Sequence, residues 1–243
     1  MRGELVYNER EYDAQEVHTM KEDMMIARLY DLRGTLARPL LENLTYPWEA
    51  LPLIGSFIVE LGKTLSPAEY ELRGENIWVA KSAKLYPNIY IAGPAIIGPN
   101  TEVRPGAFIR GNALIGAGCV VGNSTEIKNA ILFDGAQAPH YNYIGDSILG
   151  CKAHTGAGAI TSNLKQDHSP VTIRTGGERV ETAMRKFGAM LGDHVEIGCG
   201  SVLNPGTVVG RGARVYPLSM VRGFVPAHSI YKRAGEIAEI RDA

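Results

Sequence analysis

The amino-acid sequence predicts an all-β fold, a β-helix built from repeated units of six residues. Large apolar residues recur at every sixth position in two runs, small residues often follow four positions later, and Gly, Asn and Pro crowd the gaps. The runs are Val79, Leu85, Ile91, Ile97, Val103, Ile109, Ile115, Val121, Ile127 and Phe133, then Leu191, Ile197, Leu203, Val209, Val215 and Val221. A period of six fits neither a helix nor a lone strand, but it suits a short strand and a tight turn repeated around a shared interior. Gly and Asn favour the left-handed backbone conformation that such turns need.

Residues 1–75 do not follow this period, and we predict that they form a short helical cap. Helical spacing is carried by Val17, Met20, Met24 and Ala27 and, between Pro52 and Gly62, by Leu53, Phe57 and Leu61. Because the open end of a solenoid exposes apolar residues and strand edges, we expect this segment to cover an end. A lid that contacts substrate is the alternative that the sequence leaves open.

Residues 76–243 are assigned to the repeat domain, in which the step shortens once, between Ile144 and Leu149. Residues 162–187 interrupt the pattern and are predicted to protrude as a loop with a hairpin at two adjacent glycines. Insertions of this kind usually lie on a binding face. Coils return over 188–226, and Ser229–Ile240 is predicted to be a polar, weakly helical tail.

Composition narrows the function classes. The chain has 243 residues with 25 basic and 26 acidic side chains, so no electrostatic footprint of a nucleic-acid or membrane partner is present. Its cysteines, Cys119, Cys151 and Cys199, are odd in number and lack metal-type spacing, so we expect thiols in a reducing compartment. No signal-peptide pattern or long apolar stretch is seen. We therefore expect a cytoplasmic protein.

Several motifs do not belong to the repeat itself. They are Val103-Arg-Pro-Gly, Glu126-Ile-Lys-Asn, Pro139-His-Tyr-Asn-Tyr and Gly156-Ala-Gly-Ala-Ile-Thr-Ser-Asn163. Over roughly residues 95–225 the chain resembles the acetyltransferase half of the bifunctional N-acetylglucosamine-1-phosphate uridyltransferase/glucosamine-1-phosphate acetyltransferase. It is still more similar to stand-alone proteins related to N-acetylglucosamine pyrophosphorylase. The resemblance implies a left-handed parallel β-helix, a homotrimer with sites between subunits, and acetyl-coenzyme A as co-substrate.

The resemblance also implies roles for individual residues. The catalytic residues would be His140, Glu126 and Asn163, the substrate-binding residues Arg104, Lys128, Tyr143 and His154, and the coenzyme-lining residues Cys199 and Pro217; no metal is expected. A neutral histidine oriented by a carboxylate suits an amine that must lose a proton as it attacks a thioester. Fixed cations suit a sugar phosphate, and a main-chain N–H after Asn163 would suit the developing oxyanion.

The sequence departs from the family pattern at several of these positions. Pro139 replaces a Gly, His154 an Asn, Leu164 a Tyr, Cys199 a Ser and Pro217 an Ala. The family's basic loop residue has as candidate counterparts Lys165, Arg174, Lys186, Lys232 and Arg233. No Gly-rich phosphate loop lies in residues 1–75, so we do not expect the nucleotidyl-transfer half.

Three hypotheses follow. The first is an acyltransferase that uses acyl-coenzyme A and an amino sugar, sugar phosphate or nucleotide sugar. The second is a non-catalytic trimer that binds a sugar nucleotide or a partner protein, an interpretation that Pro139, His154 and Leu164 motivate. The third is a metal-dependent hydratase with His140, His154 and His168, although their equal steps of fourteen residues do not match a close pair with one distant ligand.

Overall fold

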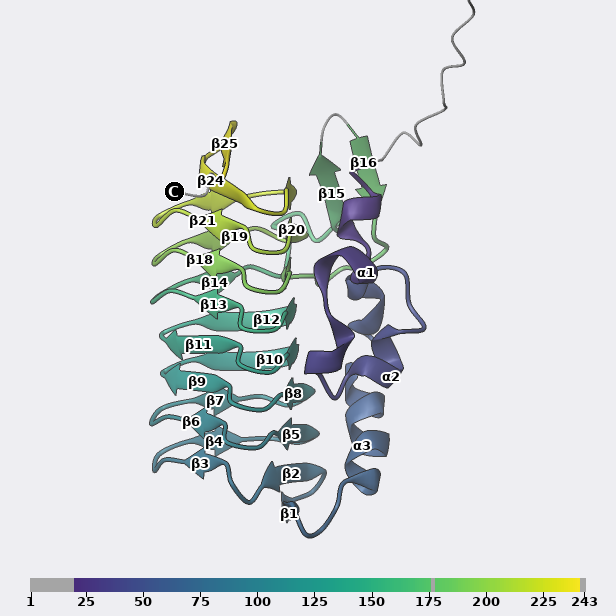
Figure 1. Ribbon diagram of the computed structural model, residues 1–243, viewed down its shortest axis with the longest axis vertical. Coiled ribbons are helices and arrows are strands. Elements are labelled where there is room, and N and C mark those ends of the chain that lie inside the picture. The colour runs from purple at the N-terminus through teal and green to yellow at the C-terminus, as the bar shows by residue number, and fades with distance from the viewer. Residues whose placement is uncertain (1–19, 176–177, 241–243) are drawn as a thin grey trace, which may run out of the picture.

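The computed structural model describes residues 20–175 and 178–240 of the chain. They form a left-handed parallel β-helix of about eight coils, with helices along one side (Figure 1). Each coil contributes short strands to three faces. The first face contains β2 (Ile77–Ala80), β5 (Ala95–Ile97), β8 (Ala113–Ile115), β17 (Ala189–Leu191), β20 (Thr207–Val209) and β23 (Phe224–Val225).

The second face contains β4 (Tyr90–Ile91), β7 (Phe108–Ile109), β14 (Ile160–Thr161), β19 (Val202–Leu203) and β22 (Met220–Val221). The third contains β3 (Lys84–Leu85), β6 (Glu102–Val103), β9 (Val120–Asn123), β11 (Gln137–His140), β13 (His154–Thr155), β18 (Glu196–Ile197), β21 (Arg214–Val215) and β24 (Ser229–Arg233). Two longer strands, β10 (Glu126–Leu132) and β12 (Tyr143–Leu149), pass from the second face to the first.

The predicted apolar ladder fills the interior. Its residues stack directly on one another between coils, as Val103 does on Val121 across β6 and β9. Asparagines at the turns adopt left-handed conformations, with φ of 61° at Asn88 and 56° at Asn100. The prediction of a left-handed β-helix of hexapeptide repeats is therefore confirmed.

One predicted rung of this ladder is wrong. Leu132, and not Phe133, points inward, because Leu132 pairs with Ile115 in one neighbouring coil and with Leu149 in the other. Phe133 lies outside the ladder, and its ring centroid is 5.0 Å from that of Tyr30. The repeat has thus already shortened by one residue after Ile127, before the step noted from the sequence.

The N-terminal segment is helical, but it covers a side of the solenoid and not an end (Figure 1). Its elements are η1 (Glu22–Met24), α1 (Ile26–Leu29), η2 (Leu32–Gly34), α2 (Arg38–Leu41), η3 (Pro47–Ala50) and α3 (Ile54–Thr64). Together with Val171, Ile173 and Val180 of the insertion, they form one apolar cluster with outward-facing side chains of the first face, namely Trp78, Ile96, Leu114, Ile131, Ile148, Met190, Val208 and Phe224. The predicted helix over 17–27 is broken into short turns, and its first residues lie outside the described ones. None of the helices in the described residues is long and apolar enough to cross a bilayer.

Antiparallel strands close the two ends instead. At one end β1 (Tyr70–Gly74) pairs with β2, and at the other β25 (Glu236–Glu239) pairs with β24. The weakly helical tail predicted at Ser229–Ile240 is therefore wrong. Gly235, with φ of 79°, provides the turn that reverses the chain between the two strands.

The insertion at 162–187 contains an antiparallel hairpin, β15 (Thr172–Thr175) and β16 (Glu178–Glu181). The two adjacent glycines at 176–177, where the turn is predicted, lie outside the described residues. Leu164 and Lys186 pair at the base of the insertion, so its two ends are held together.

Candidate functional site

Three of the predicted site residues meet around a buried carboxylate, that of Asp146. The Lys128 ammonium donates to the two Asp146 oxygens at 3.2 and 3.0 Å, and the Asn163 amide donates to Asp146 Oδ2. The Asn163 amide nitrogen also lies 3.2 Å from the Tyr143 hydroxyl oxygen. Since Asp146 is only 3% exposed, these donors replace the water that would otherwise stabilise its charge. We call Lys128, Asn129, Tyr143, Asp146 and Asn163 the Asp146 cluster.

The Asp146 cluster is also tied to the helical layer and to the insertion. Asn129 donates through Nδ2 to Asp146 Oδ1 at 2.9 Å and to the carbonyl of Leu51 at 3.2 Å. The Asp146 carbonyl accepts from the Gly188 N–H at 2.8 Å, directly after the insertion. The N-terminal segment thus helps to position the cluster through Asn129.

Asn163 is held at both its main chain and its side chain. Its carbonyl accepts from the Phe187 N–H at 2.9 Å, beside the pairing of Leu164 with Lys186. Leu164, which replaces a family tyrosine, therefore helps through its main chain to close the base of the insertion. The side-chain amide of Asn163 is left aimed at Tyr143 and Asp146.

Tyr143 adds a neutral hydroxyl to the cluster. Burial is the main cause that raises the pKa of Tyr143 above 10.0, and the negative charges of Asp146 and Glu126 add to it. The hydroxyl therefore stays protonated at neutral pH. Because it accepts a hydrogen bond from Asn163, its own proton remains free to be donated to a ligand.

Asp146 is a site residue that the sequence motifs do not single out. A Gly-Asp pair in a solenoid is an ordinary turn, and Asp146 indeed has φ of 47°. Its signal is visible only through register: Lys128 pairs with Gly145 in the next coil, so the following residue comes within reach of the lysine.

Glu126 and His140 do not form the predicted pair within one chain. Glu126 Oε1 instead accepts from Arg110 Nη1 at 2.6 Å. His140 is exposed at the end of β11, and its main-chain N–H donates to Asn142 Oδ1 at 3.0 Å. In the portion of the chain that the structure describes, no hydrogen bond joins the Glu126 carboxylate to the His140 ring.

The predicted base and the predicted coenzyme-lining residues share one corner of the solenoid. Main-chain hydrogen bonds of Gly158 to His140, Gly200 to Ala157 and Leu218 to Cys199 place successive coils in line. His140, Ala157, Cys199 and Pro217 therefore form a column. With coils about 4.8 Å apart, Cys199 and Pro217 lie roughly 10 and 14 Å along it from His140. Cys199 is exposed.

Arg104 and His154 lie away from the Asp146 cluster. Arg104, just after β6, pairs through Nε with Glu102 at 3.3 Å. His154 on β13 pairs through Nδ1 with Glu196 at 2.9 Å. Lys128 and Arg104, the two predicted phosphate ligands, thus occupy different corners of a single chain.

The candidate basic residues of the loop lie in different parts of the structure. Lys232 and Arg233 pair with Glu236 at the C-terminal end of the solenoid, at 3.5 and 2.6 Å. Lys186 is exposed at the base of the insertion. Lys165 and Arg174 line a cavity together with Arg222, a residue that the sequence motifs do not indicate.

The three histidines considered for a metal do not gather at one point. His140 lies on β11, His154 is paired with Glu196, and His168 lies in the insertion. Across residues 20–175 and 178–240, no three His, Cys, Asp or Glu side chains are arranged to hold a metal ion.

Comparison with known proteins finds relatives among bifunctional nucleotidyltransferase/acetyltransferase proteins, the family that the sequence motifs resemble. A bifunctional sugar-1-phosphate nucleotidylyltransferase/acetyltransferase from Sulfurisphaera tokodaii is 33% identical over 135 residues, which are 56% of this chain and 32% of that protein. The bifunctional protein GlmU from Methanococcus maripaludis strain S2 is 33% identical over 184 residues, 74% of this chain and 44% of that protein. The chain thus spans less than half the length of these relatives. The resemblance to the acetyltransferase half of such proteins is confirmed.

Solved structures resemble the chain more distantly. The acetyltransferase domain of PglB from Neisseria gonorrhoeae in complex with acetyl coenzyme A is 15% identical, with a TM-score of 0.37 over 68% of this chain and 58% of that one. A mutant of AntD, an N-acyltransferase from Bacillus cereus, is 18% identical with the same TM-score of 0.37, over 68% of this chain and 82% of that one.

A family model gives the broader assignment. The model described as the GMPPB C-terminal domain matches residues 91–225, a stretch that includes both the Asp146 cluster and the His140 corner. Because this match covers more than half of the sequence, the chain belongs to the GMPPB C-terminal domain family.

Proposed function

We propose that this protein is an acyl-coenzyme-A-dependent acyltransferase that acetylates an amino sugar, a sugar phosphate or a nucleotide sugar, and that it works as a cytoplasmic homotrimer. The observation that carries the proposal is the convergence of Lys128 and Asn163 on Asp146, with the Tyr143 hydroxyl bonded to Asn163. Binding sites for small molecules contain a few precisely placed polar groups that fix the orientation of the ligand, and this cluster is of that kind. The relative from Sulfurisphaera tokodaii, whose name includes a sugar-1-phosphate and acetyl transfer, supports the substrate class.

The residues have distinct chemical roles in this proposal. The Lys128 ammonium has three N–H donors, and two of them point to the oxygens of Asp146. The third is left for a substrate oxyanion. Tyr143 donates its hydroxyl proton to a sugar oxygen. His140 accepts the proton that the attacking amine or hydroxyl loses. Cys199 and Pro217, in the same column as His140, line the path of the coenzyme.

A trimer is supported by the second face. Its outward column carries Tyr90, Phe108, Ile160 and Met220, which are 58%, 41%, 38% and 59% exposed. Glu126 and Tyr143 stand in the middle of the same column. Exposed apolar groups at both ends of a polar centre suit a contact between copies that excludes water around a shared site. A neighbouring chain would then supply the group that orients His140.

The test combines binding with transfer. We expect calorimetry to show acetyl-coenzyme A binding to the wild-type protein, to His140→Asn and to the control His228→Asn, because Asn tolerates the left-handed backbone of position 228. Acetyl transfer to a panel of amino sugars and sugar phosphates, followed by mass spectrometry, should fall about 10²–10⁴-fold in His140→Asn only. Mass spectrometry avoids thiol reagents, which the exposed Cys199 would consume. Equal transfer in the two variants would refute the role of His140.

A second candidate is a non-catalytic trimer that binds a sugar nucleotide or a protein. The pairing of Glu126 with Arg110, which leaves the predicted base without its carboxylate, favours it. It predicts binding of a nucleotide sugar to the Asp146 cluster, weakened by Lys128→Ala, with no acetyl transfer to any acceptor. Transfer that depends on His140 would exclude this candidate.

A further inference from the structure

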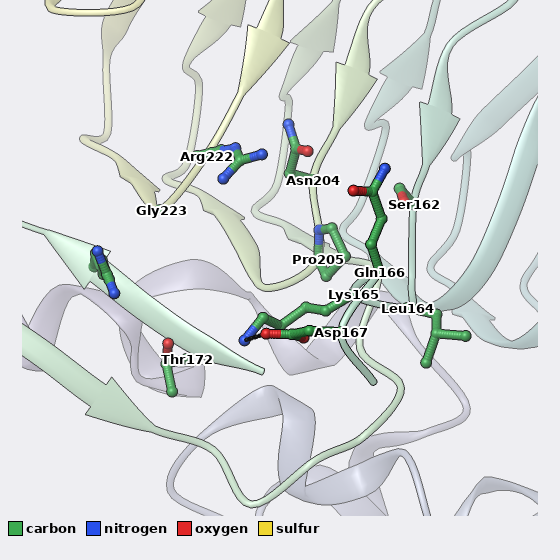
Figure 2. Close-up of a pocket in the computed structure, with 11 residues that line it drawn as sticks. Ser162, Leu164, Lys165, Gln166, Asp167, Thr172, Asn204, Pro205, Arg222 and Gly223 are labelled. Carbon is green, nitrogen blue, oxygen red and sulfur yellow. Dashed lines mark ion pairs between the residues drawn. The ribbon is translucent and has the colours of Figure 1, made fainter. Parts of the chain in front are cut away.

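The insertion and the last coils enclose a cavity that the roles above leave unused. It has a volume of about 580 Å³ and opens between the insertion and the turns after β19 and β22 (Figure 2). The residues that carry its chemistry are Ser162, Lys165, Asp167, Arg174, Asn204 and Arg222. Its size is that of a site for a nucleotide-sized ligand.

Two of the cationic side chains that line the cavity are not offset by a neighbouring carboxylate among the described residues. Lys165 is already engaged, because its ammonium donates to Ser169 Oγ and lies 3.6 Å from the Asp167 carboxylate. The charges of Lys165 and Asp167 therefore offset each other. Arg174 and Arg222 are exposed to solvent, and neither has an ion-pair partner among the described residues. The lining thus carries a net positive charge, which comes from two guanidinium groups.

A close main-chain contact joins Arg174 to Gly223, the residue that follows Arg222. A Cβ atom on Gly223, which has φ of 75°, would lie 2.1 Å from the carbonyl oxygen of Arg174. Only glycine allows β15 to approach the coil so closely. Val171, just before β15, and Ile173 within it are fully buried, so the alternate residues Thr172 and Arg174 are turned to the cavity. A packed strand therefore holds Arg174 at the cavity that Arg222 also lines.

The register of the coils determines which residues form the other wall of the cavity. Ser162, Asn204 and Arg222 follow paired residues of β14, β19 and β22 and so lie in successive coils at one corner. The same corner carries Lys128 and Gly145 in earlier coils. Asn204 Nδ2 donates to the Val221 carbonyl at 2.9 Å, which leaves its Oδ1 free as an acceptor. The cavity therefore continues the corner of the Asp146 cluster toward the C-terminal end.

We propose that this cavity is a second anion site, which binds the diphosphate of a small molecule through Arg174 and Arg222. A guanidinium donates two parallel hydrogen bonds to a phosphate, and two such groups that line one cavity from opposite walls can bind two adjacent phosphoryl groups. Ser162 and Asn204 then offer a hydroxyl and an amide to the rest of the ligand. The site does not depend on acyl transfer, since Arg174 and Arg222 lie outside the proposed catalytic residues.

The experiment is calorimetric titration of inorganic pyrophosphate into the full-length protein. Variants Arg174→Gln and Arg222→Gln are compared with Arg214→Gln, which changes an exposed arginine on β21 of the third face and removes the same charge. We expect each cavity variant to weaken binding at least tenfold, Arg214→Gln to change it less than twofold, and the wild-type affinity to fall as salt is added. Competition by coenzyme A or by a nucleoside diphosphate then distinguishes which diphosphate the site prefers.

Two results would overturn the proposal. One is the absence of pyrophosphate binding to the wild-type protein, whether or not coenzyme A binds in the His140 column. The other is an affinity that all three variants lower equally, which would report net charge only. His140→Asn separates this site from the proposed acyltransferase, because that variant should lose transfer and retain pyrophosphate binding.

Discussion

The Asp146 cluster makes a sharp prediction for Asp146→Asn, which keeps the shape of the side chain and removes its charge. Asp146 Oδ1 accepts from Lys128 at 3.2 Å and Asn129 at 2.9 Å, and Oδ2 accepts from Lys128 at 3.0 Å and from Asn163. Whichever oxygen becomes the amide nitrogen, two donors then face another donor. The substitution therefore has no orientation of the new side chain that satisfies the cluster.

The expected cost follows from these contacts. Hydrogen bonds to a charged group contribute about 1.5–3 kcal/mol each, and two of them are lost. The Lys128 side chain is 24% exposed, so water partly replaces its lost acceptor. We therefore expect the free energy of unfolding to fall by about 2–4 kcal/mol, less than complete loss of two charged hydrogen bonds would give.

Urea denaturation followed by circular dichroism measures this change. The matched control is Glu102→Gln, which breaks the more exposed pair with Arg104 and should cost at most about 1 kcal/mol. A loss below about 0.5 kcal/mol in Asp146→Asn, or one equal to that of the control, would refute the reasoning. It would mean that the cluster does not restrain Lys128 and Asn163 in solution.

Two further predictions concern the helical layer and the thiols. Leu114 is 1% exposed beneath the layer, so Leu114→Ala should lower the free energy of unfolding by about 2–5 kcal/mol in urea denaturation, whereas Leu218→Ala, at 85% exposure, should leave it nearly unchanged. Burial is the main cause that raises the pKa of Cys119 to about 12, so iodoacetamide near neutral pH should modify Cys199 in the native protein and Cys119 only after unfolding, as mass spectrometry of the labelled peptides would reveal. Equal losses in the two leucine variants, or labelling of native Cys119, would contradict these expectations.

The interior of the solenoid is predictable because one large apolar residue marks each six-residue repeat. Each large apolar residue of the ladder sits on its equivalent in the next coil, as Ile91 does on Ile109. Phe133 is misassigned because a five-residue step leaves two adjacent apolar residues, Leu132 and Phe133, and only pairing between coils decides which one points inward.

The position of the helical layer has a sequence signal that a six-residue search does not register. Trp78, Ile96 and Leu114 stand directly before ladder residues and recur every eighteen positions, once per coil. An apolar residue that faces outward once per coil marks one whole side as buried. This pattern predicts a covered side, whereas general reasoning about open ends predicts a covered end.

The candidate site is only partly accessible from the sequence. Lys128, Tyr143 and Asn163 can be chosen by residue type. Asp146 is recognised only by the hydrogen bonds that its carboxylate accepts in the structure. The pairing of Glu126 with His140 is expected from the resemblance, whereas within one chain Arg110 is a nearer partner, because it is the neighbour of Lys128 in the preceding coil.

The cavity shows why the insertion cannot be interpreted alone. Arg174 is one of five candidate cations in the sequence, and nothing in its neighbours separates it from the rest. What distinguishes it is Gly223, nearly fifty residues later, where the absence of a side chain lets the Arg174 carbonyl reach the coil. Gly206 has the same role in the preceding coil, since a Cβ atom there would lie 2.6 Å from Val171 Cγ1. Gly206 and Gly223 thus allow the strand that carries Arg174 to pack against the coils, beside the cavity that Arg222 also lines.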